Sequence, residues 1–322
     1  MNPFERAVRL VDQAQQRHGP AGFFVAVFKK FGDDRGPTLA ALLAFYGFFS
    51  LFPALLVVTT IAGFIGNDAI GDSVIGAVLG GLPVFGERIG RDATQPLQGS
   101  AFALVAGLIG VLYGAMGVAQ AGQHAMAEIW NVPGVVRPGF PVRLVRSLAF
   151  LALLGAGITV LATLGNIGTL GDTTLLARLA SLVLQVGLTV GLYVACFRVL
   201  TPKSIDTREL LPGAIVGGVG YSALLIAGSA LVRTQLRHAE ALYGQFALVL
   251  GLLGWLQLVA TVSLYGAEVN VVLRRKLWPR SIVQPPLTEA DERVLRDIAR
   301  QGERRPEQRV EVDFDEREPE AG

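Results

Sequence analysis

One acidic side chain lies within a long hydrophobic segment near the end of the chain. Glu268 is the only Asp or Glu inside those segments of the sequence that are long enough to cross a membrane. A carboxylate at membrane depth is costly, and such groups usually face the interior of a helix bundle or a cavity. These properties predict a proton- or ion-responsive carboxylate in a transport pathway.

A structural role for Glu268 is the alternative hypothesis. The residue lies about one turn from the end of its segment, where closeness to the membrane interface lowers the cost of a charge. Arg275 follows seven positions later on a similar helix face. Glu268 could therefore extend to the interface, or form an ion pair with a basic residue of another helix. Both hypotheses stay open from the sequence alone.

Two polar residues flank Glu268 in the motif Leu264–Asn270, which reads LYGAEVN. Tyr265 lies three positions before Glu268 and therefore shares its helix face. Asn270 is offset by two positions, so we expect its amide to hydrogen-bond to another helix.

The first hydrophobic segment, Ala40–Gly66, carries further polar candidates. Pro53 predicts a kink, because proline removes a backbone donor and clashes with the carbonyl four residues earlier. Ser50 or a neighbouring helix could satisfy the freed carbonyl. Tyr46 and Ser50 share one helix face, and we expect that face to contact the region of Glu268.

Trp130 and Asn131 lie in the polar stretch Glu128–Pro141 that follows the second hydrophobic segment. Tryptophan is enriched at membrane interfaces, which favours an anchoring role for Trp130. The candidate residues for a pathway or a helix-packing motif are therefore Tyr46, Ser50, Pro53, Trp130, Asn131, Tyr265, Glu268 and Asn270.

The residue types that enzyme chemistry requires are not arranged for it. The histidines, His18, His124 and His238, lack the spacing of zinc ligands. A two-metal nuclease needs clustered carboxylates, and the segments expected to face the cytoplasm carry only scattered ones. The sequence contains no GxxxxGK[ST] loop and no GxSG-type nucleophile motif with a partner histidine in a span. We therefore expect no catalytic residues, no metal and no cofactor.

The composition places the chain among membrane proteins, since 52% of its residues are hydrophobic and 17% are charged. About 20 apolar residues in a helix span a hydrocarbon core of about 30 Å. Six segments reach that length: Ala40–Gly66, Ser100–Ala121, Ser147–Gly165, Leu179–Leu200, Leu211–Val232 and Gly244–Leu273. Glycines four positions apart let helix backbones approach closely, within one chain or between two copies. Such pairs are Gly110–Gly114, Gly187–Gly191 and Gly213–Gly217.

The distribution of Lys and Arg predicts the orientation. These residues are frequent in the N-terminal flank, after the second and fourth segments, and in the C-terminal flank. The opposite flanks hold only Arg88, Arg91, Arg178, Arg233 and Arg237. Because flanks rich in Lys and Arg stay in the cytoplasm, we expect both termini in the cytoplasm, and six crossings are consistent with that orientation.

Residues 1–37 form the first of three expected parts and read as an amphipathic helix interrupted at Gly19–Pro20. One face carries Phe24, Phe28 and Phe31, and another carries Lys29 and Lys30. Such a helix suits the headgroup plane of a membrane, although a cytosolic helix packed on the bundle fits the pattern equally well.

The other two parts are residues 38–280, an expected six-helix transmembrane domain, and residues 281–322, a charged cytoplasmic tail. Residues 67–98 are of mixed polarity and predict a re-entrant or surface helix on the outer side. Within the tail we expect one capped helix at Thr288–Arg300, with Asp291 three residues after the cap. Beyond it, few large apolar residues occur, which predicts disorder.

Three motifs of this sequence carry a family resemblance. They are Ala40–Pro53, which contains Ala44–Phe45–Tyr46 and Ser50–Leu51–Phe52–Pro53; Ala127–Asn131; and Leu264–Asn270. In combination, over roughly residues 20–280, they resemble the YihY/BrkB family of bacterial inner-membrane proteins. That resemblance implies a six-helix inner-membrane protein with both ends inside, in agreement with the charge distribution. Members have carried the label ribonuclease BN, and one branch carries a virulence or serum-resistance label.

Two functions follow as the main hypotheses, and neither involves an enzyme. The leading one is a transporter or a protein that translocates lipids or envelope precursors. The alternative is an envelope-assembly or scaffold protein that does not transport, in which the same polar residues serve helix packing. A membrane-bound ribonuclease is disfavoured by the missing metal ligands. We expect membrane lipids as partners, no nucleic acid, and the capacity to form a homo-oligomer.

Overall fold

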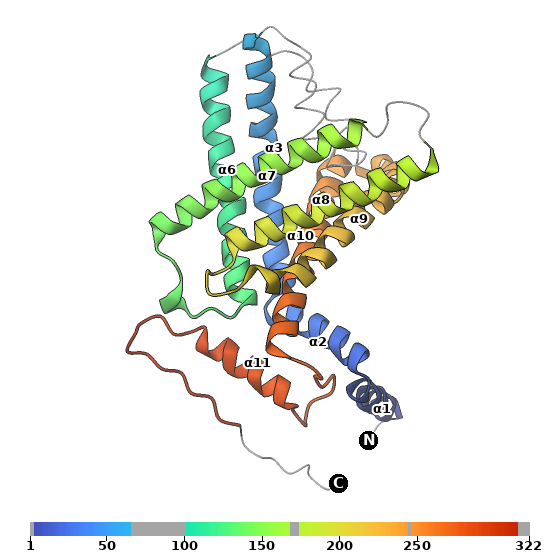
Figure 1. Cartoon of the computed structure of the whole chain (residues 1–322), viewed down its shortest axis with the longest axis vertical. Helices are drawn as coiled ribbons and strands as arrows, with labels where there is room; N and C mark the ends of the chain where they lie inside the picture. Colours follow the sequence, from blue (N-terminus) through green and yellow to red (C-terminus); the bar gives the residue numbers. More distant parts are fainter. Residues whose placement is uncertain (1–2, 66–100, 168–173, 244–245, 315–322) are drawn as a thin grey trace.

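The chain folds into a bundle of long helices with a layer of shorter helices at one end (Figure 1). The structure is a computed structural model that describes residues 3–65, 101–167, 174–243 and 246–314. Within these ranges the secondary structure is helical without a strand, which confirms the predicted all-α class.

Six helices form the bundle: α3 (Gly36–Ile65), α6 (Ala101–Ile129), α7 (Phe140–Ile167), α8 (Leu175–Leu200), α9 (Thr207–Tyr243) and α10 (Phe246–Arg275). The most extensive contacts join α3 to α6 and α9 to α10. Helix α10 also packs on α3, so it connects the two helix pairs. Consequently, side chains of α10 occupy the centre of the bundle.

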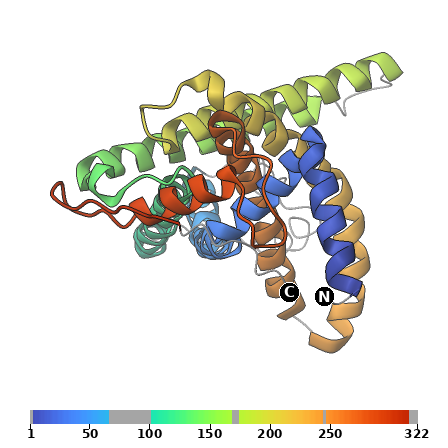
Figure 2. The same ribbon diagram turned by 90° about the horizontal axis from the view of Figure 1, so that it is seen from below.

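Shorter helices cover one end of the bundle, and the first and last described residues lie on this side (Figures 1 and 2). They are α1 (Pro3–Arg17), α2 (Gly19–Asp33) and α11 (Glu289–Arg300). We refer to residues 3–35 and 276–314 as the terminal layer. The break between α1 and α2 at His18, with Pro20 in the first turn of α2, confirms the predicted interruption at Gly19–Pro20.

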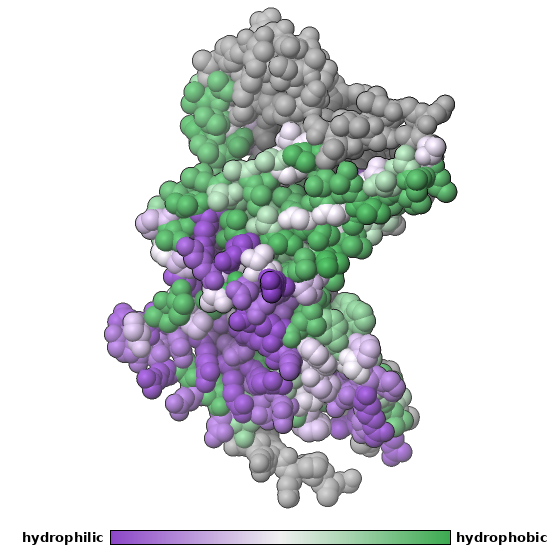
Figure 3. Space-filling model, in the orientation of Figure 1, coloured by the Kyte–Doolittle hydropathy of each residue, from purple (hydrophilic) through white to green (hydrophobic). Residues whose placement is uncertain are grey.

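The helices α6 to α10 have the length and apolar composition needed to cross a membrane. In α3 the stretch whose side chains the structure describes continuously, Gly36–Leu51, is apolar but shorter than this length. Figure 3 shows a hydrophobic surface over the bundle and a hydrophilic surface over the terminal layer. This division identifies a multi-pass membrane protein. The surface helix predicted within residues 67–98 lies outside the described residues.

Glycines allow α6 to approach α3 closely. A Cβ atom added to Gly110 would lie 2.8 Å from the ring of Pro53. A Cβ atom added to Gly114 would lie 2.8 Å from the Cα atom of Ser50. Both distances are too short for real carbon atoms, so only glycine fits these positions without a shift of α3. The close packing predicted from the pair Gly110–Gly114 is thus confirmed.

The pair Gly187–Gly191 of α8 behaves differently. A Cβ atom at either position would meet no described atom within 4 Å. This pair therefore makes no close contact with another described helix. In the pair Gly213–Gly217 of α9, by contrast, a Cβ atom added to Gly213 would collide with the carbonyl oxygen of Gly266 in α10. The four-residue spacing of the glycines therefore does not show by itself which pair lies in a close helix contact.

Asp291 holds α11 on the terminal layer. Thr288 and Asp291 form the predicted capping box, which fixes the start of the helix. The Asp291 carboxylate also accepts hydrogen bonds from Nζ of Lys29 at 2.9 Å, Nε of Arg280 at 2.8 Å and the backbone N–H of Ser281 at 3.0 Å. Burial by itself raises the pKa of Asp291, but the hydrogen bonds from Ser281, Lys29 and Thr288 outweigh burial and lower that pKa below its usual value.

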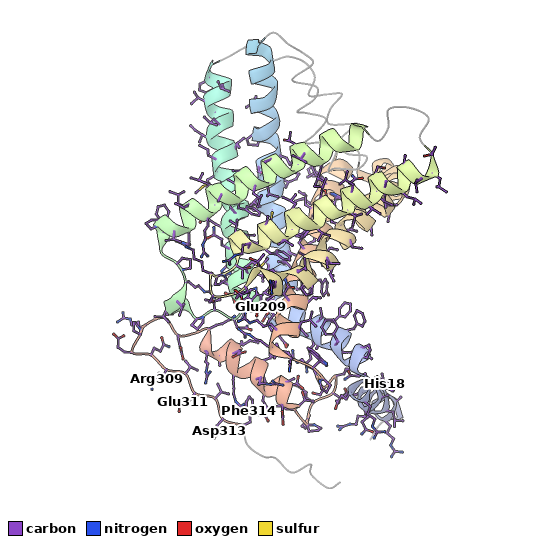
Figure 4. The ribbon with its side chains drawn as sticks, in the orientation of Figure 1. His18, Glu209, Arg309, Glu311, Asp313 and Phe314 are labelled. Atoms are coloured by element: carbon purple, nitrogen blue, oxygen red, sulfur yellow. The ribbon has the colours of Figure 1, made fainter. Side chains whose placement is uncertain are left out.

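The described part of the tail, residues 301–314, follows α11 and contacts the bundle. The side-chain amide of Gln301 donates to the carbonyl of Glu128 at 2.8 Å, and the N–H of Val135 donates to the carbonyl of Glu303 at 3.0 Å. The guanidinium group of Arg296 lies 5.1 Å from the ring centre of Phe314, which Figure 4 labels below α11. The composition of residues 301–314, with few large apolar side chains, gives no indication of these contacts.

Candidate functional site

Glu268 is completely buried in α10, where this helix packs on α2. Its Oε2 atom lies 3.9 Å from Nζ of Lys30, which is also completely buried. Neither carboxylate oxygen of Glu268 accepts a hydrogen bond from an N–H or hydroxyl donor of the described residues. The Asp34 carboxyl group lies close enough to share a hydrogen bond with it when one of the two is protonated. The carboxylate thus has a nearby opposite charge but lacks the hydrogen bonds that buried charges normally receive.

Lys30 serves more than one acceptor. Its Nζ forms an ion pair with Asp34, one turn later, and donates to the carbonyl of Ile129 at 3.1 Å. Asp34 is 7% exposed and acts as the C-cap of α2. Lys30, Asp34 and Glu268 therefore form a buried charge cluster in which two carboxylates share one amine.

The buried charge cluster continues into a polar connection that leads to α11. The side-chain amide of Asn131 donates to Oδ1 of Asp34 at 3.4 Å. Arg275 donates to Oδ1 of Asn131 at 3.4 Å and to the carbonyl of Trp130 at 2.6 Å. Arg275 also forms an ion pair with Asp297 of α11 at 2.7 Å. Residues that directly follow α2 and α6 thus meet residues of α10 and α11 through one set of contacts.

The backbone at the end of α6 explains why Asn131 reaches this position. Asn131 has φ 48°, in the left-handed region that asparagine tolerates better than most residues. That conformation follows the end of α6 at Ile129 and directs the chain toward η1 (Gly134–Val136). The Trp130 side chain is 3% exposed, and the guanidinium group of Arg274 lies 5.8 Å from its ring centre. Trp130 is therefore a core residue at the end of α6.

The two residues that flank Glu268 have packing contacts. The ring of Tyr265 stacks on Phe31 at 4.1 Å between centres and meets the edge of Phe28 at 5.2 Å. Asn270 accepts a hydrogen bond from the N–H of Gly213 at 2.6 Å and donates to the carbonyl of Leu210 at 3.2 Å. These bonds confirm the prediction that Asn270 pairs with another helix, here the first turns of α9.

The candidates on the first hydrophobic segment pack against α6. The ring of Tyr46 occupies the space that a side chain at Gly117 would need. The Ser50 hydroxyl donates to the carbonyl of Gly47 at 2.8 Å. No hydrogen bond, ion pair or ring contact between described residues joins Tyr46, Ser50 or Pro53 to Glu268. The described contacts of this face are with α6, and its expected contact with the Glu268 region stays a prediction.

An ion pair with a basic residue of another helix, one of the structural roles considered for Glu268, is present with Lys30 of α2. The sequence did not identify which residue would form it. Lys30 was placed on the polar face of the N-terminal helix, and this assignment is wrong, since the side chain is 0% exposed. Asp34 is not among the candidate residues that the sequence identifies. Their four-residue spacing predicts an ion pair. However, the sequence contains no signal that α2 would turn this pair toward α10.

No three His, Cys, Asp or Glu residues of the described ranges gather as metal ligands would. Among known proteins, neither a curated sequence nor a solved structure matches the chain. The sequence profile of the family described as Virulence factor BrkB, by contrast, matches residues 27–286. This match extends from α2 to the loop before α11 and includes all three residues of the buried charge cluster. The chain is thus a membrane protein that belongs to the BrkB family.

Proposed function

We propose that this protein transports a lipid or an envelope precursor across the bacterial inner membrane, and that Glu268 takes part in the transport step. The observation that carries the proposal is the state of the Glu268 carboxylate. It is 0% exposed within a helix long enough to cross a membrane, and neither oxygen accepts a hydrogen bond from an N–H or hydroxyl donor of the described residues.

An incompletely satisfied carboxylate is costly to keep in a protein interior. A purely structural acid would be expected to have its oxygens hydrogen-bonded, as those of Asp291 are. At Glu268, a proton or a cation arriving during a transport cycle would offset the negative charge. Lys30 could then shift its contact between Glu268 and Asp34, because both carboxylates lie beside its amine.

The proposal includes a topology of six crossings with both termini in the cytoplasm. The bundle has six long helices, and an even number of crossings returns the chain to the side where it started. The first and last described residues belong to the terminal layer (Figure 1), whose surface is hydrophilic (Figure 3). This layer includes Lys29, Lys30, Arg35, Lys276 and Arg280, which belong to the flanks expected on the cytoplasmic side. The terminal layer would thus face the cytoplasm, with α1 and α2 next to the headgroups.

A scaffold function is the second candidate, and one specific observation favours it. Lys30 does lie near Glu268, and the contacts that continue through Asn131 and Arg275 join four helices. A protein that only organises envelope assembly would use these residues for rigidity. It would co-purify with stable partners or form a homo-oligomer. Its function would not require Glu268 to bind or release a proton or a cation.

Movement of a labelled phospholipid in proteoliposomes separates the two functions. Purified wild-type protein is compared with Glu268→Gln, with empty liposomes, and with Glu289→Gln, the same chemical change at an exposed position of α11. We expect translocation by wild type and Glu289→Gln, and at least about a tenfold lower rate for Glu268→Gln, since its neutral amide cannot exchange a proton.

Each other outcome has a definite meaning. Equal rates for both variants would make Glu268 structural and would remove the mechanistic part of the proposal. No translocation by any protein, together with lower abundance of Glu268→Gln in the membrane, would favour the scaffold. Metal-dependent RNA cleavage by the purified protein would instead support a nuclease and contradict the proposal.

A further inference from the structure

A cavity of about 670 Å³ opens next to the terminal layer. It lies between the end of α6, the loop that contains η1, the start of α7, the loop from α8 to α9, and the end of α10. Its cationic lining residues are Arg137, Arg143, Arg146, Lys203, Arg274 and Arg275. Among the described residues that line it, none is Asp or Glu. The cavity therefore has a strongly positive wall.

Half of these cations have acidic partners outside the cavity lining. Arg137 pairs with Glu128 at 2.9 Å, Arg275 pairs with Asp297 at 2.7 Å, and Arg274 pairs with Glu209.

The other three, Arg143, Arg146 and Lys203, form no ion pair with a described residue. Arg143 and Arg146 lie one turn apart at the start of α7, and Lys203 approaches from the loop between α8 and α9. Three cations without partners, converging from two elements on one cavity, favour an anionic ligand.

Two buried residues of the same wall have polar atoms without partners. Trp130 is 3% exposed, and its indole N–H has no acceptor among the described residues. Gln123 is 8% exposed, and its side-chain oxygen likewise has no donor there. The amide nitrogen of Gln123, by contrast, donates to the carbonyl of Arg143 at 3.2 Å and so fixes the start of α7 against α6. The positive wall is thus held in place by buried contacts.

A second cavity of about 600 Å³ adjoins the first one. Its apolar and aromatic wall comes from α3 and α6 and includes Leu42, Tyr46, Leu112, Tyr113 and Met116. The two cavities share Gln120, His124 and Arg143 in their linings. A positive compartment at the end of the bundle therefore lies next to an apolar compartment along helices that have a hydrophobic surface.

We propose that the two cavities together bind a lipid that carries a phosphate group. The phosphate lies in the positive compartment against Arg143, Arg146 and Lys203, and a hydrocarbon chain lies in the apolar compartment against Leu112 and Met116. Guanidinium groups bind phosphate oxygens through paired hydrogen bonds, and two arginines one turn apart can hold one phosphate. A soluble phosphate ester would leave the apolar compartment empty. This inference rests on the proposed function and names the chemical class of its substrate.

The test measures binding to the purified full-length chain in a neutral detergent, by titration with phosphatidic acid. Diacylglycerol with the same chains lacks the phosphate, and glycerol 3-phosphate lacks the chains. The variant Arg143→Gln/Arg146→Gln removes two cations of the wall, and Lys203→Gln removes one at an exposed position. Arg208→Gln is the matched control, because Arg208 is exposed near the same end of the bundle and does not line the cavity.

We expect wild type and Arg208→Gln to bind phosphatidic acid with affinities within about twofold of each other. The double variant should bind at least about tenfold more weakly, and Lys203→Gln about threefold more weakly, since each removes charge-assisted hydrogen bonds to phosphate. Diacylglycerol and glycerol 3-phosphate should each bind wild type at least about tenfold more weakly than phosphatidic acid. Lys203 is in an exposed loop, so its variant keeps the test valid should the double variant fail to fold.

Three results would overturn the inference: undiminished binding by both cation variants, binding of glycerol 3-phosphate as tight as that of phosphatidic acid, or equal binding of diacylglycerol. Translocation assays with the same proteins separate this inference from the proposed function. If wild type binds phosphatidic acid as expected but moves no lipid, the transport proposal fails and the binding site stands. If Arg143→Gln/Arg146→Gln moves lipid at the wild-type rate, transport stands and the site fails.

Discussion

At the scale of single residues, Lys30 determines the charge balance around Glu268. The side chain is completely buried, and its amine lies beside Asp34, Glu268 and the carbonyl of Ile129. Without this amine, two carboxylates would remain at a site that excludes solvent. Breaking a buried ion pair by removing one partner costs more than the pair itself contributes, because an unpaired charge is left behind.

We therefore expect Lys30→Met to lower the free energy of unfolding by about 3–5 kcal/mol. Lys276→Met, at an exposed position, should change it by less than about 0.5 kcal/mol. Denaturant unfolding in detergent measures both. The double variant Lys30→Met/Glu268→Gln should lose less free energy of unfolding than the sum of the losses in the two single variants, since Glu268→Gln removes one of the charges that Lys30→Met leaves unpaired. Equal losses for Lys30→Met and Lys276→Met would contradict the buried charge cluster.

At the scale of helices, glycines decide which pairs pack closely. A Cβ atom at Gly114 would meet backbone and Cβ atoms of Ser50 within 3.0 Å, and backbone cannot move aside as a flexible side chain can. At Gly187 the same atom would meet nothing within 4 Å. Identical substitutions at these two positions should consequently have opposite effects.

We expect Gly114→Ala to lower the free energy of unfolding by about 1–3 kcal/mol, as extra atoms in a packed interface do. Gly187→Ala should leave it unchanged or raise it by up to about 1 kcal/mol, because alanine favours a helix over glycine. Both can be measured by unfolding in the same detergent. A loss at Gly187 as large as that at Gly114 would show that α8 packs closely on something else, such as a second copy of the chain.

At the scale of the whole molecule, the terminal layer joins the two ends of the chain. Helices α1 and α2 come from the beginning and α11 from the end, and Arg280 lies between them with its guanidinium paired to Asp33 at 2.7 Å and Asp291 at 2.8 Å. Asp291 is thus the acceptor on which the docking of α11 depends. Its lowered pKa links that docking to pH.

The direction of the pH effect follows from that shift. The pKa of Asp291 is lower in the docked state than the value of about 3.9 for a free aspartate. Its carboxylate therefore stabilises the docking of α11 fully above about pH 4, and this stabilisation is lost progressively as the pH falls below about 4. Hydrogen exchange of α11 amides, corrected for the intrinsic rate, should therefore accelerate on acidification from pH 5 to pH 3. Asp291→Asn should accelerate it already at pH 7, whereas Asp313→Asn, at an exposed tail position, should not. Exchange in Asp291→Asn that matches wild type at pH 7 would argue against this role.

Local signals in the sequence determined a large part of the structure. Long apolar segments predicted a helical membrane protein, because a backbone in lipid must satisfy its own hydrogen bonds. The break at Gly19–Pro20 and the capping box of Thr288 and Asp291 act within one turn, so neighbouring residues suffice to predict them. The amide of Asn270 was expected to pair with another helix because little else is available at that depth.

Only the tertiary structure decided which of these segments meet. The burial of Lys30 beside Glu268 brings together α2 and α10, whose residues are far apart in sequence, and no local pattern encodes that contact. The same holds for Tyr46, which packs on α6, for Arg275, which pairs with Asp297 of the tail, and for the cations that converge on the positive cavity. Helix formation depends on neighbours within a few residues, whereas the partner of each helix face depends on how all the helices pack together.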